Sequence, residues 1–298
     1  MPVKISQESK KFQLIKQAPL SGEEIAGNLL KMNPALVRDW LVAFLQDEII
    51  RRRNFKKAII GLSGGVDSAL VTYLCAEALG PENVIAVRMP YATSSRDSLD
   101  HAQLVIDDLG IQSRTIEITK AVDGFVAEYE PDADGRRRGN VMARTRMIIV
   151  FDLSAKYNAL PVGTGNKSER LFGYYTWHAD DSPPINPIGD LYKSQVWELA
   201  RLVGVPSIIV DKPASADLIQ GQTDESDFGI SYKRADTILA LLLRGYSREH
   251  IIRLGIPAAE LDLVKSKVDS THWKRHLPTT AMLSSTSIND YYLRPVDY

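Results

Sequence analysis

Two patterns of apolar residues alternate along the chain: short continuous runs, and longer stretches in which apolar residues lie three and four positions apart. Short runs such as KAIIGL (57–62) are apolar and rich in β-branched residues, which predicts buried strands. Longer stretches such as DSALVTYLCAEAL (67–79) carry apolar residues three and four positions apart and end at glycine, which predicts helices. The predicted strands are 57–62, 83–90, 114–119 and 159–165. The predicted helices are 35–53, 67–79, 99–109, 140–158, 191–203, 233–245, 247–255 and 258–270.

Alternation of strands and helices predicts an α/β fold. We expect a doubly wound parallel sheet of about five strands flanked by helices, with extra N- and C-terminal helices. The first predicted helix, 35–53, directly precedes the first strand. It carries an apolar stripe formed by Leu36, Trp40, Leu41, Phe44, Leu45 and Ile49. Ligands of such sheets bind at the carboxyl ends of the strands.

Two long segments have little periodicity. Residues 166–190 are polar, aromatic and proline-containing, which indicates an ordered functional loop, and residues 212–229 indicate a loop that is mobile unless something binds it. We therefore divide the chain into an N-terminal extension (1–33), one main domain (34–278) and a C-terminal tail (279–298).

Composition and charge argue against several classes of protein, namely nucleic-acid-binding, secreted and membrane proteins. With 298 residues, 44% of them hydrophobic, the chain can bury one large core. Its 36 basic and 37 acidic residues give a net charge of −1, so we expect no nucleic acid partner. The basic triplets 51–53 and 136–138 are expected on solvated faces. No apolar run reaches signal-peptide or membrane-spanning length, so we expect a cytoplasmic protein that binds no membrane.

The chain has one cysteine, Cys75. A single cysteine excludes an intramolecular disulfide, a CxxC metal site and a cysteine-relay thiolation mechanism within the chain. Because Val71 and Leu79 lie four residues to either side of it in a predicted helix, we expect Cys75 to pack in the core.

The stretch SGGVDS (63–68), between the first strand and its helix, predicts an anion site. Gly64 and Gly65 allow a tight bend that presents backbone N–H groups, the helix directs its positive end at the same place, and Ser63 and Ser68 add hydroxyls. An ordinary phosphate loop would add a lysine here. Asp67 stands there instead, which indicates a nucleotide pyrophosphate bound together with Mg²⁺.

SGGVDS resembles the signature of the N-type ATP pyrophosphatases, which have an adenine nucleotide alpha hydrolase-like fold. Five further stretches occur in the order and spacing of ammonia-dependent NAD synthetases, and the resemblance covers roughly residues 35–278. These stretches are NVMARTRM (140–147), GTGNKSE (163–169), PINPIGDLYKSQVWELA (184–200), KPASADLIQGQTDE (212–225) and HWKRHLP (272–278).

The resemblance implies a reaction and its partners. The nicotinate carboxylate of deamido-NAD attacks the α-phosphorus of ATP, pyrophosphate leaves, and ammonia displaces AMP to give NAD⁺. No protein nucleophile is needed, so catalysis consists of positioning and charge neutralisation. Mg²⁺ is the implied cofactor, and a homodimer the implied assembly.

The resemblance also implies roles for individual residues. Asp67 and Glu169, at the ends of two strands, are the implied magnesium ligands, and with Lys193 they form the implied catalytic set. The implied ATP-binding residues are Gly61, Leu62, Ser63, Gly64, Gly65, Val66, Asp67, Ser68, Arg88, Thr164, Lys193 and Ser215. The implied deamido-NAD residues are Arg144, Trp177, Asp180 and Lys274.

The sequence departs from the family pattern in two places. Trp177 stands where a lysine is expected, and Trp273 separates a histidine and a lysine that are expected to be neighbours. Both departures concern the deamido-NAD site rather than the ATP site. Tyr174, Tyr175 and Trp177 either supply a flat surface for the pyridine ring or pack in a dimer core.

Other functions remain to be weighed. The chain lacks the length and the cysteine of a fused glutaminase, so free ammonia or a separate glutaminase subunit supplies the nitrogen. The ATP-binding half of a guanylate synthetase has a similar loop, but the stretches GTGNKSE (163–169) and HWKRHLP (272–278) argue against it. A tRNA-modifying pyrophosphatase would need a basic face. An inactive ATP sensor is the alternative from another class, and metal-dependent ATP turnover separates it from an enzyme.

Overall fold

A four-stranded parallel sheet lies at one end of the molecule. The structure is a computed structural model that describes residues 22–215, 223–276, 280–281 and 283. The strands are β1 (Lys57–Gly61), β2 (Val84–Arg88), β3 (Gln112–Thr115) and β4 (Ala159–Pro161), in the order β3-β2-β1-β4. All neighbours are parallel, which confirms the predicted parallel sheet. The sheet has four strands where about five were expected, and an isolated parallel bridge between Val162 and Ile185 lies beyond β4.

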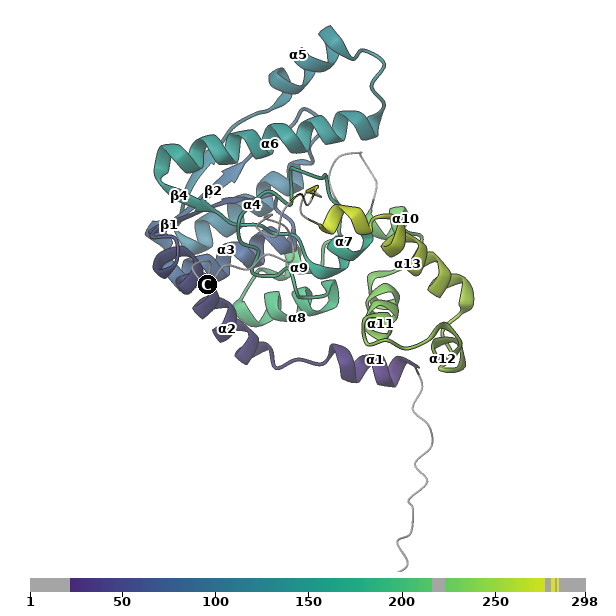
Figure 1. Cartoon of the computed structure of the whole chain (residues 1–298). Helices are drawn as coiled ribbons and strands as arrows, with labels where there is room; N and C mark the ends of the chain where they lie inside the picture. Colours follow the sequence, from purple (N-terminus) through teal and green to yellow (C-terminus); the bar gives the residue numbers. More distant parts are fainter. Residues whose placement is uncertain (1–21, 216–222, 277–279, 282, 284–298) are drawn as a thin grey trace, which may run out of the picture.

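Helices cover both faces of the sheet, as the doubly wound prediction requires (Figure 1). On one face lie α2 (Pro34–Gln46), α3 (Val66–Leu79), α4 (Arg96–Leu109) and α8 (Lys193–Val203). On the other lies the long helix α6 (Gly135–Tyr157), against which α5 (Thr119–Tyr129) packs.

Side chains of β1 alternate between two apolar cores, as strand geometry requires. Ala58 and Ile60 pack with α3, whereas Ile59 packs with Leu153 of α6. Cys75 of α3 is fully buried in the first core, and burial raises the pKa of its thiol to about 12. This confirms the packing role predicted for the single cysteine.

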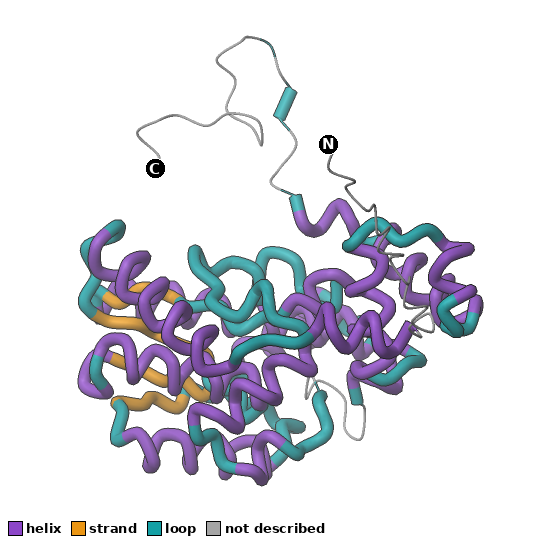
Figure 2. The backbone as a smooth tube through the Cα atoms, turned by 90° about the horizontal axis from the view of Figure 1, so that it is seen from below, coloured by secondary structure: helices purple, strands orange, loops and turns teal. Residues whose placement is uncertain are grey.

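A second, wholly helical core lies beyond the sheet (Figure 2). It is built around Tyr232, Phe172 and Phe228, and α1 packs against α11 within it. Its helices are α1 (Gly22–Leu30), α7 (Lys167–Phe172), α10 (Asp224–Phe228), α11 (Tyr232–Leu243), α12 (Arg248–Arg253) and α13 (Ala258–Ser270). Four short elements complete the described chain: a π-helical turn at Asp47–Arg51, a 3₁₀ turn at Pro81–Asn83, α9 (Ser207–Val210) and a 3₁₀ turn at His272–Arg275.

Several features differ from the sequence predictions, among them the helices α7 and α10, which lie inside the two segments predicted to be loops. The third strand spans Gln112–Thr115 rather than the predicted 114–119. Helix α5 was not predicted, and α6 begins five residues before the predicted start because Asp134 caps it, accepting a hydrogen bond from the backbone N–H of Arg137. Leu36 and Trp40 of the predicted apolar stripe are exposed rather than packed.

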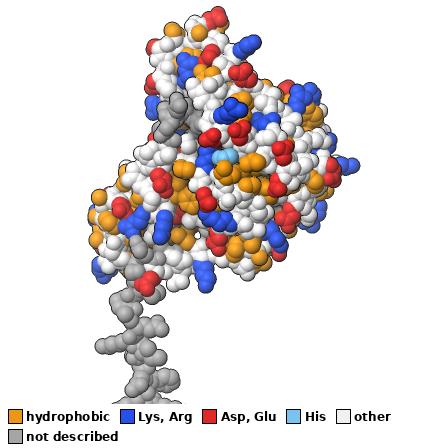
Figure 3. All heavy atoms as spheres, turned by 180° about the vertical axis from the view of Figure 1, so that it is seen from behind, with side chains coloured by type: hydrophobic (Ala, Val, Ile, Leu, Met, Phe, Trp, Pro, Cys, Tyr) orange, Lys and Arg blue, Asp and Glu red, His pale blue; other side chains and the backbone are white. Residues whose placement is uncertain are grey.

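Charged side chains are interspersed on the surface. The triplet 136–138 lies in α6, where Arg137 pairs with Glu130 and Arg138 pairs with Asp123. On the face seen in Figure 3, basic and acidic side chains alternate without a broad patch of one sign. Among the described residues, none of the helices is both long enough and apolar enough to span a membrane.

Candidate active site

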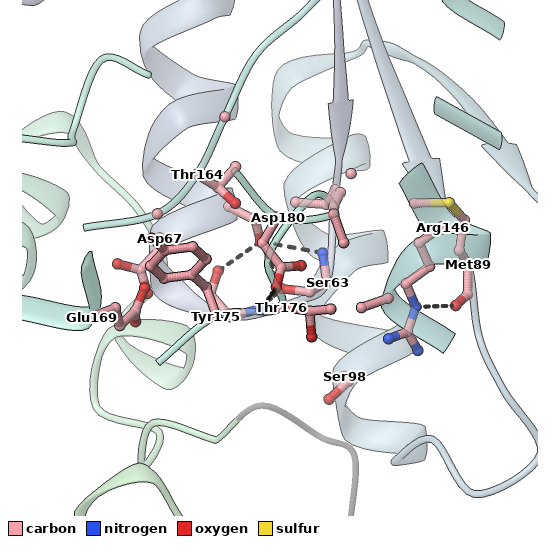
Figure 4. Close-up of a pocket in the computed structure, with 18 of the residues that line it drawn as sticks. Ser63, Asp67, Met89, Ser98, Arg146, Thr164, Glu169, Tyr175, Thr176 and Asp180 are labelled. Carbon is pink, nitrogen blue, oxygen red and sulfur yellow. Dashed lines mark hydrogen bonds between the residues drawn. The ribbon is translucent and has the colours of Figure 1, made fainter. Parts of the chain in front are cut away.

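A cavity of about 530 Å³ opens where β1, β2 and β4 end. Its walls come from the glycine loop after β1, the end of β2, the start of α4, the segment that follows β4 and the segment that follows α9. This is the edge of the sheet at which the parallel strands predicted a ligand site. Figure 4 shows Asp67 and Glu169 close together on one side of the cavity and Arg146 and Met89 on the other.

The glycine loop is held in shape by its own hydroxyls. Ser63 Oγ lies 3.0 Å from Ser68 Oγ, and Ser68 Oγ donates to the carbonyl oxygen of Gly65 at 3.0 Å. Gly64 has a φ of +81°, and a Cβ atom there would lie 2.0 Å from the carbonyl oxygen of Ser98. Gly64 is therefore required both by its left-handed backbone and by the close approach of α4.

Asp67, Glu169 and Lys193 converge, although they come from three separate helices. The ammonium group of Lys193 binds Asp67 Oδ2 and lies 3.4 Å from Glu169 Oε1. The side chain of Lys193 is only 2% exposed, and those of the two carboxylates are 17% and 18% exposed. The structure thus brings together the three residues of the predicted catalytic set.

Electrostatics favour the charged form of Lys193 but oppose the ionised form of Glu169. Burial alone would lower the pKa of Lys193, but the neighbouring carboxylates of Asp67 and Glu169 more than offset this effect, so its pKa is raised. Burial raises the pKa of Glu169, and the negative charge of Asp67 adds to this effect. A further cation beside the two carboxylates would favour their ionised forms.

Asn166 links Asp67 to the helix start that carries Glu169, a role that the sequence analysis did not assign to it. Its side-chain N–H group donates to Asp67 Oδ1 at 3.0 Å, while its side-chain oxygen caps α7 by accepting from the backbone N–H of Glu169 at 3.0 Å. The carboxylate of Glu169 in turn accepts from the backbone N–H of Asn166, which completes a capping box. The signal was present in the spacing Asn-x-x-Glu within GTGNKSE.

Asp224 is a third carboxylate at the cavity that sequence analysis missed. Its side chain is 4% exposed, and Oδ2 accepts from the hydroxyl of Tyr232 at 2.9 Å. Its Oδ1 is buried without a hydrogen-bond partner. Burial raises the pKa of Asp224, whereas the charge of Lys193 lowers it. Its position within KPASADLIQGQTDE gave no sign of this burial.

The ATP-binding residues implied by resemblance largely gather at this cavity. Thr164, Arg88 and the exposed Ser215 line it, together with every residue of 61–68 except Gly64. Arg88 Nη1 donates to Gln103 Oε1 of α4 at 2.6 Å, and its Nε is buried without a partner. Part of the segment predicted to be mobile, residues 216–222, lies outside the described residues.

The implied deamido-NAD residues are more scattered. Asp180 lines the cavity and accepts from the backbone N–H of Thr176 at 2.7 Å. Arg144, Trp177 and Lys274 lie outside the lining. Arg144 donates to the carbonyl oxygen of Trp177 at 3.1 Å, and Lys274 Nζ donates to the carbonyl oxygen of Gly173 at 2.7 Å.

The three clustered aromatic residues point to different places. Tyr174 and Tyr175 both line the cavity, and Tyr174 also packs against Phe228 of the helical core. Trp177 makes an edge-to-face contact with Trp273, their ring centroids 5.1 Å apart. Trp177 and Trp273, the two residues that depart from the family pattern, therefore contact each other. Their distance in sequence gave no indication of this contact.

Protein side chains of the cavity could supply only some of the ligands that Mg²⁺ needs. Among the described residues, no group of three or more His, Cys, Asp or Glu side chains is arranged to enclose a metal ion. Asp67 and Glu169 are two carboxylates that line the cavity. Magnesium is commonly held by one or two carboxylates together with substrate phosphates and water, so the residues present fit this mode of binding.

Comparisons with known proteins agree on one family. A family model described as NAD synthase matches residues 37–278. The NH(3)-dependent NAD(+) synthetase of Chlorobaculum parvum is 48% identical over 257 residues, which cover 86% of this chain and 92% of that protein. The enzyme of the same description from Trichlorobacter lovleyi is 47% identical over 261 residues, covering 87% of this chain and 95% of that protein.

Solved structures agree with this result. A structure described as NMN synthetase from Francisella tularensis has a TM-score of 0.75 at 31% identity, covering 84% of this chain and 99% of that one. An NH3-dependent NAD synthetase from Campylobacter jejuni has a TM-score of 0.73 at 31% identity, covering 84% of this chain and 100% of that one.

Proposed function

The chain belongs to the NAD synthase family, and from this premise we propose that the cavity at the carboxyl edge of the sheet is where it performs the family's reaction. The enzyme is a ligase that uses ATP to amidate deamido-NAD with ammonia, giving NAD⁺, AMP and pyrophosphate. The convergence of Asp67, Glu169 and Lys193 beside the glycine loop is the observation that supports this location.

In the first step, an oxygen of the nicotinate carboxylate bonds to the α-phosphorus of ATP. The bond from that phosphorus to the bridging oxygen breaks, and pyrophosphate leaves with the electron pair. The backbone N–H groups at the start of α3, together with Ser63 and Ser68, are placed to bind the phosphates, because a helix N-terminus favours anions.

In the second step, the nitrogen of ammonia bonds to the acyl carbon and the bond to the AMP oxygen breaks. The nitrogen releases one proton to give the neutral amide. The described cavity needs no nucleophilic side chain for either step, and its contribution is to hold both substrates in line.

We propose that Asp67 and Glu169 hold Mg²⁺ together with the ATP phosphates. When bound, the ion neutralises charge on the phosphates and on the departing pyrophosphate. Lys193 bridges the two carboxylates, its positive charge opposes protonation of Glu169, and Asn166 orients Asp67.

We also propose a homodimer. Helix α6 exposes Ile148, at 62%, and Phe151, at 39%, and Phe151 also lines the cavity. A second copy seated on this face of α6 would bury the exposed residues and border the cavity.

For the ammonia source, we propose direct use of ammonia rather than a glutaminase subunit. The support is the similarity to NH(3)-dependent enzymes over nearly their whole length. Ammonium at saturating concentration should then support turnover as well as any glutamine-supplied mixture. A glutamine-driven rate that appears only when a second protein is added would contradict this proposal.

A complete assay tests the function. Purified protein receives ATP, Mg²⁺, deamido-NAD and ammonium, and NAD⁺, AMP and pyrophosphate are followed together. The expected result is equimolar formation of all three. Because one similar structure is described as an NMN synthetase, nicotinate mononucleotide replaces deamido-NAD in a parallel reaction. Formation of AMP and pyrophosphate without NAD⁺ would show that the acceptor is a different carboxylate.

A further inference from the structure

The basic side chains of the cavity differ in whether a carboxylate pairs with them. Five basic side chains line it: Arg88, Arg146, Arg170, Lys193 and Lys212. The charge of Lys193 is taken up by Asp67 and Glu169, with Asp224 adding further negative potential. If ATP binds here as proposed, its phosphates add further negative charge, and a second cation beside them would favour their binding.

Lys212 lines the same cavity as the glycine loop. It follows α9, and its ammonium group donates to Ser98 Oγ at 3.0 Å. Ser98 is the residue whose carbonyl oxygen presses against Gly64, so Lys212 is joined to the glycine loop through a single residue. Figure 4 shows Ser98 on the cavity wall, apart from Asp67 and Glu169.

The charge of Lys212 is not used within the described part of the chain. No carboxylate there forms a salt bridge with it, and the adjacent Asp211 pairs with Arg201 instead. Its partner Ser98 is a neutral hydroxyl. Lys212 can therefore exchange its hydrogen bond to the Ser98 hydroxyl for one to an anion without breaking an ion pair within the described residues.

His101, one turn after Ser98 on α4, adds no second charge. It is 8% exposed, and its Nδ1 is buried without a hydrogen-bond partner. Burial lowers the pKa of His101, and the positive charge of Lys212 lowers it further, which favours the neutral imidazole. Lys212 is thus the source of positive charge beside Ser98.

We propose that Lys212 binds the β- and γ-phosphates of ATP and accompanies the pyrophosphate as it leaves. This rests on the proposed function. As the bond between the α-phosphorus and the bridging oxygen breaks, the electron pair goes to pyrophosphate, whose added negative charge is neutralised by the Lys212 ammonium group. No proton is transferred. Lys212 therefore supplies the cation that the glycine loop lacks, while Lys193 organises the two carboxylates.

The test compares Lys212→Met and Lys212→Arg with a matched control, Lys265→Met, which removes an exposed lysine of α13 paired with Asp269. The measurements are KM for ATP, kcat, and the inhibition constant of pyrophosphate as a product. For Lys212→Met we expect a rise of about 10- to 100-fold in the pyrophosphate inhibition constant and a fall in kcat, on the scale of one lost charge-assisted hydrogen bond.

Lys212→Arg should restore most of the pyrophosphate affinity, since it keeps the charge, and Lys265→Met should match the unmodified enzyme. An unchanged pyrophosphate inhibition constant in Lys212→Met would overturn the inference while leaving the proposed function intact. Equal loss in the Met and Arg variants would also overturn it, because the side chain would then act through packing. An unmodified protein that forms no NAD⁺ would instead contradict the proposed function.

Discussion

The glycine loop lacks the lysine of an ordinary phosphate loop, and a lysine 126 positions later binds its aspartate. At the scale of single residues, this explains why an acid is tolerated beside a phosphate site. Asp67 is paired, oriented by Asn166 and held close to Glu169 through Lys193.

Asp67→Asn and Glu169→Gln should each lower Mg²⁺-dependent turnover by on the order of 100-fold or more, because each removes one proposed metal ligand and one partner of Lys193. Circular dichroism and steady-state rates over a Mg²⁺ titration measure the effect, and we expect the fold to be retained. Asp190→Asn is the control, since the Asp190 side chain is 95% exposed. Rates near those of the unmodified enzyme in both variants would remove the metal assignment.

Gly64→Ala tests the glycine loop. The left-handed backbone at this position disfavours alanine by roughly 1–2 kcal/mol, and the carbonyl of Ser98 must also move. We expect lower stability in urea unfolding and a large loss of turnover, because the start of α4 would shift. Gly124→Ala is the control: with no atom within 4 Å of its Cβ in α5, it should stabilise by about 0.5–1 kcal/mol. Full activity in Gly64→Ala would contradict the assigned role of the close approach.

Some residues of the site could be predicted from the sequence and others could not. The loop 63–68 and Glu169 carry their signals in local motifs, and the structure confirms that Asp67, Glu169 and Lys193 meet. Lys193 by its type alone indicates a solvated lysine, because burial depends on segments distant in sequence. The same holds for Asp224 and for the contact between Trp177 and Trp273.

At the scale of elements, one buried carboxylate joins three helices around the site. Asp236 of α11 is fully buried, accepts a hydrogen bond from the hydroxyl of Ser168 in α7, and accepts from the backbone N–H of Ser194 in α8 at 2.9 Å. Ser168 Oγ also accepts from the backbone N–H of Lys193 at 3.0 Å. The helical core thereby fixes the helix start that carries the buried lysine.

Asp236→Ala should therefore destabilise the protein by about 3 kcal/mol, since it leaves buried donors of Ser168 and Ser194 without an acceptor. Urea unfolding measures the loss. Asp262→Ala, which removes an exposed partner of Arg248, is the control and should cause no measurable change. A loss for Asp236→Ala no larger than that of the control would show that the three helices are joined by other contacts.

Strands and long helices were predictable because their apolar spacing is regular. The predicted strands 57–62, 83–90 and 159–165 contain β1, β2 and β4, although β4 is four residues shorter than predicted. Helix α5 was missed because TKAVDGFVAEY contains Gly124, carries no side-chain cap, and buries only Val122 and Val126. Packing against α6, which local sequence does not encode, stabilises it.

At the scale of the whole molecule, the exposed apolar residues of α6 lie beside the cavity. We expect the enzyme to sediment as a dimer under active conditions. Ile148→Asp should give monomers with reduced turnover, because it places a charge on the proposed interface. Leu36→Asp, at a position of α2 that is 64% exposed, is the control and should remain dimeric. A monomeric, fully active enzyme would refute the homodimer.

The single buried thiol has a practical consequence. Cys75 lies in α3, the helix whose start forms the glycine loop, and the elevated pKa keeps it in the unreactive thiol form. A thiol-specific reagent can modify it only when the layer of α3 opens. The rate of labelling at neutral pH therefore reports how often that layer opens, and slower labelling in the presence of ATP would register nucleotide binding without an engineered probe.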